Sequence, residues 1–503
     1  MTAPRLGASM LGASVLGALP AGVAAPRYDR TALEAGMAHI GVGAFHRTHQ
    51  AEFADDLLAQ RFDRWGIVGI NIRPPLLGET LGAQDGLYTR LLREDDRVEA
   101  RVIGSIVSVV DSAESAAPAL AVLASPEIDV VTMTVTEKGY CHIPATGALD
   151  PARGEIVHDI ADPEHPVSLP GILLRALEMR RATHGRPLTL VSCDNIPANG
   201  AILQSVVGAL AERRGGGLAG WIAANAAFPG TMVDRIAPAP TELDRRFVEE
   251  RLGYRDEAVV VGEPFRQWVI ENRFAGRFPD YAAVGAQLVE DVEVFEHLKM
   301  RILNGAQTAL CYQGVLAGLE HTFDDMADPL LARFVRRMLV EESVPTLEPV
   351  PGIAPLAYVD ESLSRLRNTA IRHRNHQIAT DGSQKIVQRL LNPIRDRIRA
   401  GASFDLLSAA VAGWMAYLVL AAERFGRRWT VDDPFATRVA AIADTAGADP
   451  RQLVAGITAI DAIFAPELAG NPRFTAAVAW HLAGFIGADP MAHLARVTGA
   501  AGA

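Results

Sequence analysis

The chain has 503 residues, of which 49% are hydrophobic and 21% are charged. This is the composition of a globular protein, and the length predicts two or three domains. The net charge of −11, without a concentrated basic stripe, argues against nucleic acids and anionic membranes as partners. Three cysteines without a C-x-x-C pair argue against a disulfide framework or structural zinc and favour a cytoplasmic location.

Two apolar runs need an explanation in a chain of this class. Residues 6–26, within a Gly/Ala-rich leader over 1–30, imitate a secretory signal, but the run has few long aliphatic residues and a single basic residue before it. Residues 406–422 form 17 residues without a charge, slightly short of a membrane span. We expect an uncleaved leader, a buried core helix at 406–422 and no membrane partner.

The first half of the chain alternates between strand-like and helix-like segments. Helical segments over 49–60 and 171–185 separate apolar runs of strand length. Continuous apolar runs are typical of strands covered on both faces, and strand–helix alternation indicates an α/β domain with a mostly parallel sheet. The runs that we expect to form strands are 37–42, 65–72, 101–110, 128–136, 188–193 and 258–265.

The second half, from about residue 290, has a mostly helical pattern. Asp328-Pro329 and Asp449-Pro450 each place a capping acid before a proline, which is a helix-start signal. We therefore expect a dinucleotide-binding domain over 1–287 and a helical substrate-binding and catalytic domain over 288–503. The helical segments that we expect are 294–318, 328–343, 384–401, 405–424 and 449–464.

A glycine-containing turn, in "HIGVGAFHRTHQA", follows the first expected strand. Gly41 and Gly43 form a G-x-G at the start of a helix, where backbone N–H groups and the helix dipole favour a pyrophosphate. The third glycine of the usual fingerprint is replaced by His46, and a lone G-x-G is also common in turns without a ligand. Arg47, beside the turn, is a candidate for a further phosphate contact.

The second expected strand ends in "INIRPP", residues 70–75. In NAD-binding sheets this strand end usually carries an acid that binds the adenosine ribose, and the motif contains none. Arg73 is therefore either a contact for the 2′-phosphate of NADP or an exposed loop arginine.

The motif "SCDNIPANG", residues 192–200, follows another expected strand. The carboxyl ends of strands line the ligand crevice of a doubly wound sheet, so we expect Asp194 and Asn195 to face the substrate. The competing interpretation is a simple turn, because Asp, Asn and Pro are common turn residues.

The segment "EHLKMRILNGAQ", residues 296–307, places polar side chains in a helix that otherwise has a buried pattern. At about 100° per residue, Glu296, Lys299, Asn304 and Gln307 fall within an arc of roughly 140°. On a solvated face this lysine would be an ordinary surface charge, whereas a buried lysine with a lowered pKa can act as a general acid–base. Asn304 could then donate to a developing alkoxide, and Glu296 could relay protons.

Taken together, these segments resemble the mannitol dehydrogenase family of polyol-specific long-chain dehydrogenases. The resemblance covers about residues 20–490, and its motifs here are "GVGAFHRTHQA", "TVTEKGYC", "SCDN", "FPGTMVDRI", "GEPFRQWVIE", "LKMRILNGAQ" and "HRNHQIATDGSQK". Three of them, "TEKGYC", "EPFRQWVIE" and "HRNHQIATDGSQK", are most similar to the D-mannonate oxidoreductase (fructuronate reductase) branch. The resemblance implies a Rossmann-like domain followed by a mostly α-helical domain, substrate bound between them, NAD as cofactor and no metal.

The resemblance also implies roles for individual residues. Lys299 matches the family's general acid–base, and Asn195 and Asn304 match asparagines that polarise the carbonyl. The residues that we expect to bind substrate are Asp234, Gln307, Arg374, Lys385 and Glu296. The residues that we expect to bind the cofactor are Gly41, Val42, Gly43, Ala44, Phe45, His46, Arg47, Asn71, Arg73, Thr136 and Glu137.

Two departures from the family pattern bear on the substrate. The family motif K-x4-N-x2-H has Gln307 in place of the histidine, and glutamine can hydrogen-bond a hydroxyl but cannot titrate. Polyol-type members carry an arginine eight residues before the "DGSxK" lysine, where this chain has Gln377, as in the mannonate-type branch. The carboxylate of a uronate then needs another cation, and Arg374 and Lys385 are the candidates.

The leading hypothesis is a metal-independent NAD(P)-dependent oxidoreductase that interconverts D-fructuronate and D-mannonate. The alternative within this class is a polyol dehydrogenase acting on mannitol, arabinitol or a related alditol. The intact Lys299, Asn195 and Asn304 argue against an inactive nucleotide-sensing module, and the lack of zinc-ligand spacing argues against a zinc alcohol dehydrogenase. A short-chain dehydrogenase would need a Tyr-x-x-x-Lys, which the sequence lacks. We expect a monomer or small homo-oligomer.

Overall fold

The computed structural model describes residues 3–7, 22–143, 146–487 and 489–499, so much of the expected leader, residues 8–21, lies outside the described residues. By its internal contacts the chain divides into two compact units, Met1–Glu293 and Val294–Ala503. Within the described ranges, no helix combines the length and the apolar character that crossing a lipid bilayer requires.

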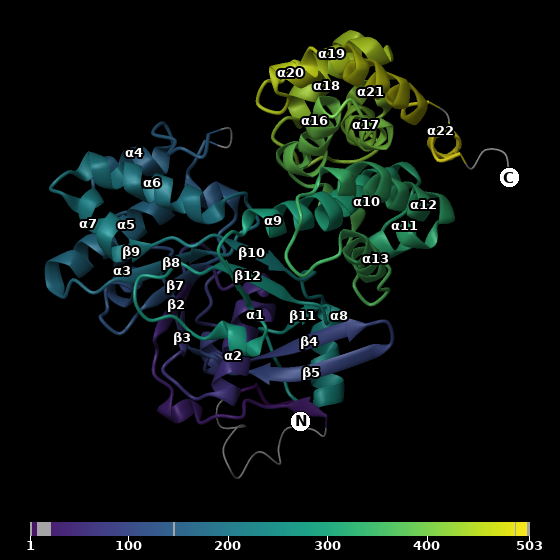
Figure 1. Ribbon diagram of the computed structural model, residues 1–503. Coiled ribbons are helices and arrows are strands. Elements are labelled where there is room, and N and C mark those ends of the chain that lie inside the picture. Colours follow the sequence, from purple (N-terminus) through teal and green to yellow (C-terminus); the bar gives the residue numbers. More distant parts are fainter. Residues whose placement is uncertain (1–2, 8–21, 144–145, 488, 500–503) are drawn as a thin grey trace. The chain divides into compact units, whose positions relative to one another are not determined.

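The first unit contains a six-stranded parallel sheet (Figure 1). Its strands are β2 (Met37–Ile40), β3 (Ile67–Asn71), β6 (Ile106–Asp111), β7 (Val130–Met133), β8 (Leu188–Ser192) and β9 (Ala226–Ala227). The strand order is β6-β3-β2-β7-β8-β9, so the chain direction across the sheet reverses between β2 and β7. In doubly wound sheets, ligands bind outside the carboxyl ends of the strands at such a switch point. The predicted Rossmann-like fold class is thereby confirmed.

Apolar side chains cover both faces of this sheet, as its continuous apolar strands require. On one face α3, α5, α6 and α7 pack over residues such as Ile40 and Met133, and on the other α2 packs over Met37 and Ile67. The helices of this part are α1 (Ala44–Thr48), α2 (Gln50–Gln60), α3 (Ala117–Leu123), α4 (Gly154–Ala161), α5 (Leu169–Thr183), α6 (Asn199–Arg214) and α7 (Leu218–Asn225). The two apolar layers cover the faces of the sheet and leave its strand ends for a ligand.

The run 101–110, which we expected to be one strand, is two strands in different sheets. β5 (Arg97–Ile103) pairs antiparallel with β4 (Tyr88–Glu94), whereas β6 joins the parallel sheet. The break lies at Gly104 and Ser105: the Gly104 N–H donates to Asp55 at 2.8 Å, and the Ser105 hydroxyl donates to the Ala51 carbonyl at 2.7 Å. Contacts with the distant helix α2 therefore end the strand.

Two smaller sheets complete the first unit, with the orders β1-β5-β4-β11 and β10-β12-β13. The run 258–265, expected in the parallel sheet, instead forms the short strand β11 beside β4. β13 pairs with β12, so the boundary expected after residue 287 falls inside a strand of this unit. The remaining elements are β1 (Val23–Ala24), β10 (Thr231–Asp234), α8 (Glu242–Phe247), β11 (Val260–Gly262), β12 (Gln267–Glu271) and β13 (Gln287–Val289).

The second unit is helical, and π-helical turns interrupt several of its helices. These turns cover Met300–Asn304, Met338–Ser343 and Val387–Leu391. The helices are α9 (Glu293–Lys299), α10 (Gly305–Leu316), α11 (Thr322–Ala327), α12 (Pro329–Arg337), α13 (Pro355–Leu366), α14 (Asn375–Ala379), α15 (Gly382–Ile386), α16 (Asn392–Arg399), α17 (Asp405–Leu420), α18 (Ala436–Ala446), α19 (Pro450–Thr458), α20 (Pro466–Ala469), α21 (Pro472–Phe485) and α22 (Pro490–Val497).

The uncharged run at 406–422 forms α17, which is buried along its whole length after Asp405 and contacts α10 and α21. This confirms the core-helix interpretation. Both predicted helix starts are also confirmed. Asp328 accepts the N–H of Leu330 at 2.8 Å, and Asp449 accepts the N–H of Arg451 at 2.9 Å. These signals are local, which is why the sequence reveals them.

Candidate active site

The G-x-G turn leaves β2 at the switch point of the parallel sheet. Gly41 has a φ of +91°, and a Cβ there would lie 2.1 Å from the Thr134 carbonyl oxygen, so only glycine fits. The Gly41 N–H donates to the Ile70 carbonyl at 2.9 Å, and its carbonyl accepts the Thr134 hydroxyl at 2.8 Å. Gly43 is exposed, and a Cβ there would meet only the Gly41 carbonyl, at 3.9 Å. The turn therefore presents bare backbone at the switch point.

His46, at the position of the third glycine, lies beneath this turn. Its ring is fully buried and stacks on His39, with the ring centroids 3.3 Å apart. Burial lowers the pKa of His39 to about 3 and the pKa of His46 well below its usual value, so both rings are neutral at pH 7. The stacked rings fill space that a glycine would leave open. Of His46, only the backbone remains a candidate for cofactor binding.

Arg47 makes contacts away from the turn. Its guanidinium donates to the Ala258 carbonyl and lies 5.5 Å from the ring centroid of Tyr88, whose hydroxyl donates to the Arg47 carbonyl at 2.6 Å. These contacts tie α1 to the sheet that contains β4 and β11. The phosphate contact of Arg47 stays a prediction. The other turn residues differ in exposure, with Val42 buried and Ala44 and Phe45 partly exposed.

The strand end of β3 is held by a carboxylate that the sequence analysis missed. Asp111, at the end of β6, accepts the N–H groups of Leu77 and Gly78, each at 2.9 Å, and the Asn71 amide at 3.1 Å. Burial works in the opposite direction, but these donors hold the pKa of Asp111 below its usual value. Arg73 lies in this loop with 64% of its side chain exposed, 3.7 Å from Glu155. An exposed cation at this strand end is compatible with both interpretations of Arg73.

Asp194, at the end of β8, was expected to face the substrate; its carboxylate instead binds the loop that follows β7. Oδ2 accepts the Val135 N–H at 2.9 Å and the Tyr140 hydroxyl at 2.6 Å, and Oδ1 accepts the Thr136 N–H at 2.9 Å. Burial raises the pKa of Asp194, while the three donors oppose this shift. Asn195, the next residue, is exposed and has a contact within the protein.

Thr136 has an unusual backbone conformation in that loop. Its φ of 68° and ψ of 161° lie in a region that is almost restricted to glycine. For a β-branched residue this conformation costs about 1–3 kcal/mol and persists only where the surroundings enforce it. Such strain is concentrated at functional sites. Thr136 is exposed and Glu137 partly exposed, so both predicted cofactor residues are accessible at the surface.

Asp234, at the end of β10, is 2% exposed and lies opposite Gln267 of β12. The next residue, Arg235, is also buried and donates to the Glu52 carboxylate at 2.6 Å and to the Phe265 carbonyl at 3.0 Å. This ion pair joins the strand end to α2. Asp234 is therefore a carboxylate held on a rigid element, as a substrate-binding acid must be.

The helix that carries Lys299 is buried but is not a regular α-helix. Glu296, Lys299, Asn304 and Gln307 are 5–7% exposed. The π-helical turn over Met300–Asn304 separates Lys299 from Gln307, so the 100° per residue assumed for this helix does not hold across that turn. Asn304 Nδ2 donates to Gln307 Oε1 at 3.2 Å. The face is thus buried rather than solvated, and π-turns of this kind are frequent at functional sites.

Lysine is rare in this chain, which is a signal that the sequence analysis overlooked. Of 48 lysines and arginines, only Lys138, Lys299 and Lys385 are lysines. Arginine supplies nearly all of the positive side-chain charge, so these three positions are candidates for tasks that a guanidinium cannot perform, such as losing a proton. All three lie in motifs that carried the family resemblance.

The two candidate cations for a substrate carboxylate differ in their surroundings. Lys385 is partly buried and donates to the carbonyls of Ile378 and Thr380 at the end of α14. The side chain of Arg374 is 65% exposed and pairs with Glu320. Lys385 is therefore held in place, whereas Arg374 lies on the surface.

A buried carboxyl in α11 was not anticipated. Asp325 is fully buried, and Gly314 makes room for it, because a Cβ there would lie 2.0 Å from Asp325 Oδ1. The Asn375 amide donates to Oδ1 at 2.9 Å, and Oδ2 has no hydrogen-bond partner among the described residues. Burial raises the pKa of Asp325 to about 8, so this carboxyl is mostly protonated at pH 7.

Among the residues that the structure describes, no group of three or more His, Cys, Asp or Glu side chains could hold a metal ion. The three cysteines are buried and free.

Comparisons with known proteins identify the family to which this chain belongs. The mannitol dehydrogenase Rossmann domain model matches residues 35–281, and the mannitol dehydrogenase C-terminal domain model matches residues 291–485. The chain belongs to the mannitol dehydrogenase family. As a member of the mannitol dehydrogenase family it is an oxidoreductase.

Two relatives and one solved structure are similar to this chain over nearly its full length. The uncharacterized oxidoreductase YeiQ of Escherichia coli (strain K12) is 39% identical over 92% of this chain and 95% of the relative. D-mannonate oxidoreductase of the same strain is 39% identical over 91% of this chain and 94% of the relative. The ternary complex of Pseudomonas fluorescens mannitol 2-dehydrogenase with NAD and D-mannitol is 33% identical, with a TM-score of 0.90 over 98% of this chain and 99% of that chain. Similarity to proteins with different named substrates leaves the substrate to be argued from the site.

Proposed function

We propose that this protein is an NAD(P)-dependent oxidoreductase that interconverts a keto-uronate and its hydroxy acid, with D-fructuronate and D-mannonate as the first pair to test. The observation that carries the proposal is the buried Lys299 on the π-interrupted helical segment that also carries the Asn304–Gln307 amide pair. The similarity to D-mannonate oxidoreductase supports a sugar acid. The similarity to a mannitol 2-dehydrogenase supports the alternative, an alditol such as mannitol or arabinitol.

The turn of β2 fits the pyrophosphate of a dinucleotide. Gly41 takes a conformation that other residues avoid, and Gly43 adds no side chain above the backbone. NAD is the cofactor that we propose, since the NAD complex of the similar mannitol 2-dehydrogenase supports it. Arg73 keeps NADP as the alternative. When bound, the nicotinamide gives a hydride to the keto carbon or takes it from the alcohol carbon.

The protein's residues handle the proton and the developing charge. In reduction, the Lys299 ammonium gives a proton to the oxygen of the former carbonyl, and in oxidation the neutral amine takes that proton back. Asn195 and Asn304 donate N–H groups to the same oxygen as its charge grows. Gln307 receives the Asn304 amide on its oxygen, which leaves its own N–H groups for a substrate hydroxyl.

A keto-uronate also needs a cation for its carboxylate. We propose Lys385 for this task, because backbone carbonyls hold its ammonium in place and lysine is rare in the chain. Arg374, paired with Glu320 on the surface, is the second candidate. Asp234 and Glu296 are proposed to bind substrate hydroxyls.

The test is a panel of keto-uronates, ketoses and alditols, each assayed with NAD(H) and NADP(H). We expect the highest kcat/KM with a keto-uronate and NADH. Lys299→Ala and Lys299→Arg should both lower kcat by at least ~10²-fold, because neither residue can supply and recover the proton near neutral pH. NADH affinity should barely change in either variant. Alditols as the best substrates would move the assignment to the alternative, and normal turnover of Lys299→Arg would refute the proton-transfer role.

A further inference from the structure

The loops after β7 and β8 are joined by a carboxylate that contacts both of them. Asp194 belongs to the β8 end and directly precedes Asn195, while its two oxygens accept the consecutive N–H groups of Val135 and Thr136. Tyr140 adds a third donor from the same loop. One side chain therefore sets the spacing between the loop of two predicted cofactor residues and the residue proposed to polarise the carbonyl.

The same hydrogen bonds continue to the glycine turn. Thr134 donates its N–H to the Ile40 carbonyl at 2.9 Å and its hydroxyl to the Gly41 carbonyl at 2.8 Å. Asp194 binds the next two residues of the chain. The G-x-G turn, the loop after β7 and the Asn195 loop are thus linked across three neighbouring strands, β2, β7 and β8, on both sides of the switch point.

Thr136 shows that this link imposes a conformation on the loop. Its glycine-like φ and ψ are unfavourable for a β-branched residue. The N–H of Thr136 and the N–H before it can both reach the Asp194 carboxylate in this conformation. An asparagine at 194 presents one acceptor and one donor, so one of the two N–H groups would lose its partner.

We propose that Asp194 is a positioning residue that holds Thr136 in its strained conformation and thereby fixes the loop after β7 against Asn195 for cofactor and substrate binding. The catalytic part of this inference rests on the proposed function. Asp194 itself touches neither the substrate nor the cofactor; it acts through the backbone of Thr136 and through its neighbour Asn195.

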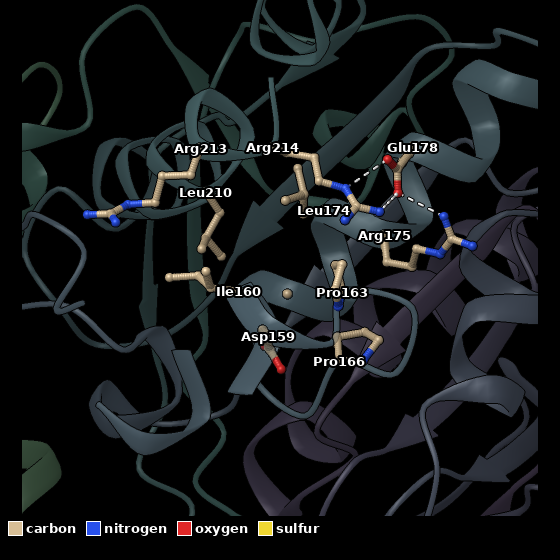
Figure 2. A pocket seen from close by; sticks show the side chains of 11 residues that line it. Asp159, Ile160, Pro163, Pro166, Leu174, Arg175, Glu178, Leu210, Arg213 and Arg214 are labelled. Carbon is tan, nitrogen blue, oxygen red and sulfur yellow. Dashed lines mark hydrogen bonds and ion pairs between the residues drawn. The ribbon is translucent and has the colours of Figure 1, made fainter. Parts of the chain in front are cut away.

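Asp159 offers a matched control. It is a buried carboxylate that accepts the consecutive N–H groups of Val167 and Ser168, at 2.7 and 3.0 Å, and the Ser168 hydroxyl. Like Asp194 it binds two N–H groups and one O–H group. It belongs to α4 and binds the segment just before α5, where it lines a cavity of about 200 Å³ (Figure 2), and not at the strand ends of the switch point. Removing this carboxylate therefore shows the effect of losing two N–H acceptors at a position away from the predicted cofactor residues.

The experiment compares Asp194→Asn with Asp159→Asn in the full-length protein. NADH binding is followed by fluorescence titration, turnover by kcat and KM, and folding by the midpoint of thermal unfolding. We expect both variants to unfold at lower temperature. Asp194→Asn alone should also weaken NADH binding and lower kcat/KM by about 10- to 100-fold, the scale of one lost charge-assisted hydrogen bond. Equal effects of the two variants on binding and turnover would overturn the proposal.

Two further variants keep the test decisive if Asp194→Asn does not fold. Tyr140→Phe removes one donor to Asp194 and should raise the KM or the NADH dissociation constant by a smaller factor; unchanged values would count against the clamp.

Thr136→Gly removes the strain, so a double-mutant cycle with Tyr140→Phe should show coupling in the unfolding midpoint. Additive midpoints would overturn the proposal. This last measurement needs no turnover, so it separates failure of the clamp from failure of the proposed reaction, which the substrate panel alone would reveal.

Discussion

The two units hold their candidate residues in different ways. In the first, backbone N–H groups of strand-end loops bind carboxylates, as Leu77 and Gly78 bind Asp111. In the second, helix packing positions the side chains, and the buried Asp325 receives a single side-chain amide on one of its oxygens. The pKa of Asp111 is accordingly below its usual value, and burial raises the pKa of Asp325 to about 8. At the partly exposed Asp111 the donors outweigh burial, whereas at Asp325 burial outweighs the single donor, so the two carboxyls make stability depend on pH in opposite directions.

The largest expected effect concerns Asp325→Asn. The pKa of this carboxyl rises from 3.8 to about 8 on folding, so the folded protein binds the proton more tightly than the unfolded chain. Its contribution to stability is then complete below pH ~4 and is lost as the pH rises through about 8. At up to about 1.4 kcal/mol per pH unit, the wild type should lose roughly 4 kcal/mol relative to the variant between pH ~5 and ~8. Urea unfolding of both proteins across this range measures the difference.

Asp449→Asn is the control for this comparison. Asp449 caps α19 and is not among the charges that shift the pKa of Asp325, and asparagine is an equally good cap. The control should keep the pH slope of the wild type, whereas Asp325→Asn should flatten it. Parallel curves for all three proteins would show that Asp325 is ionised in the folded state.

A smaller effect is expected for Gln307→His, which tests side-chain positioning in the second unit. The histidine of the family pattern can donate or accept and can gain charge near pH ~6.5, whereas the glutamine amide is neutral at every pH. We expect the relative kcat/KM values across the substrate panel to shift by about 1–3 kcal/mol, the scale of one altered polar contact. Assays from pH ~5 to ~10 would show whether a new titration appears.

Gln307→Met separates a polar role from packing at this position. Methionine has a similar length but makes no comparable hydrogen bond to Asn304 or to a substrate hydroxyl. A polar role predicts reduced kcat/KM for this variant. An unchanged substrate ranking in both variants would mean that Gln307 only packs.

The smallest effect is expected for Arg73→Ala, in the loop that Asp111 holds. If the exposed guanidinium binds a 2′-phosphate, NADPH binding should weaken by about 10-fold while NADH binding stays unchanged. Arg153→Ala is the matched control, because Arg153 also lies beside Glu155, at 3.5 Å, and its loss removes the same charge. Fluorescence titration with both cofactors measures these affinities. If NADPH binding weakens equally in the two variants, Arg73 acts only as a general surface charge.

Features with local causes could be predicted from the sequence. The caps at Asp328 and Asp449 use side-chain contacts two residues away, and the apolar run at 406–422 needs no distant information to be recognised as a core helix. Strand–helix alternation likewise predicts the parallel sheet. The run at 101–110 could not be divided correctly, because the break depends on α2, about fifty residues earlier in the chain.

The candidate site likewise combines features that the sequence determines with features that only tertiary packing determines. The sequence predicts the polar residues of the site helix, Lys299, Asn304 and Gln307, and the buried pattern around them. It also provides the glycine at position 41 that the turn requires. Whether that helix contains a π-turn depends on how neighbouring helices pack against it, since local propensity does not distinguish α from π at a single turn. The direction of the Asp194 carboxylate is likewise a tertiary result. A short polar side chain at a strand end can face solvent or bind a backbone, and only the position of the neighbouring strand brings Val135 and Thr136 within 2.9 Å of it.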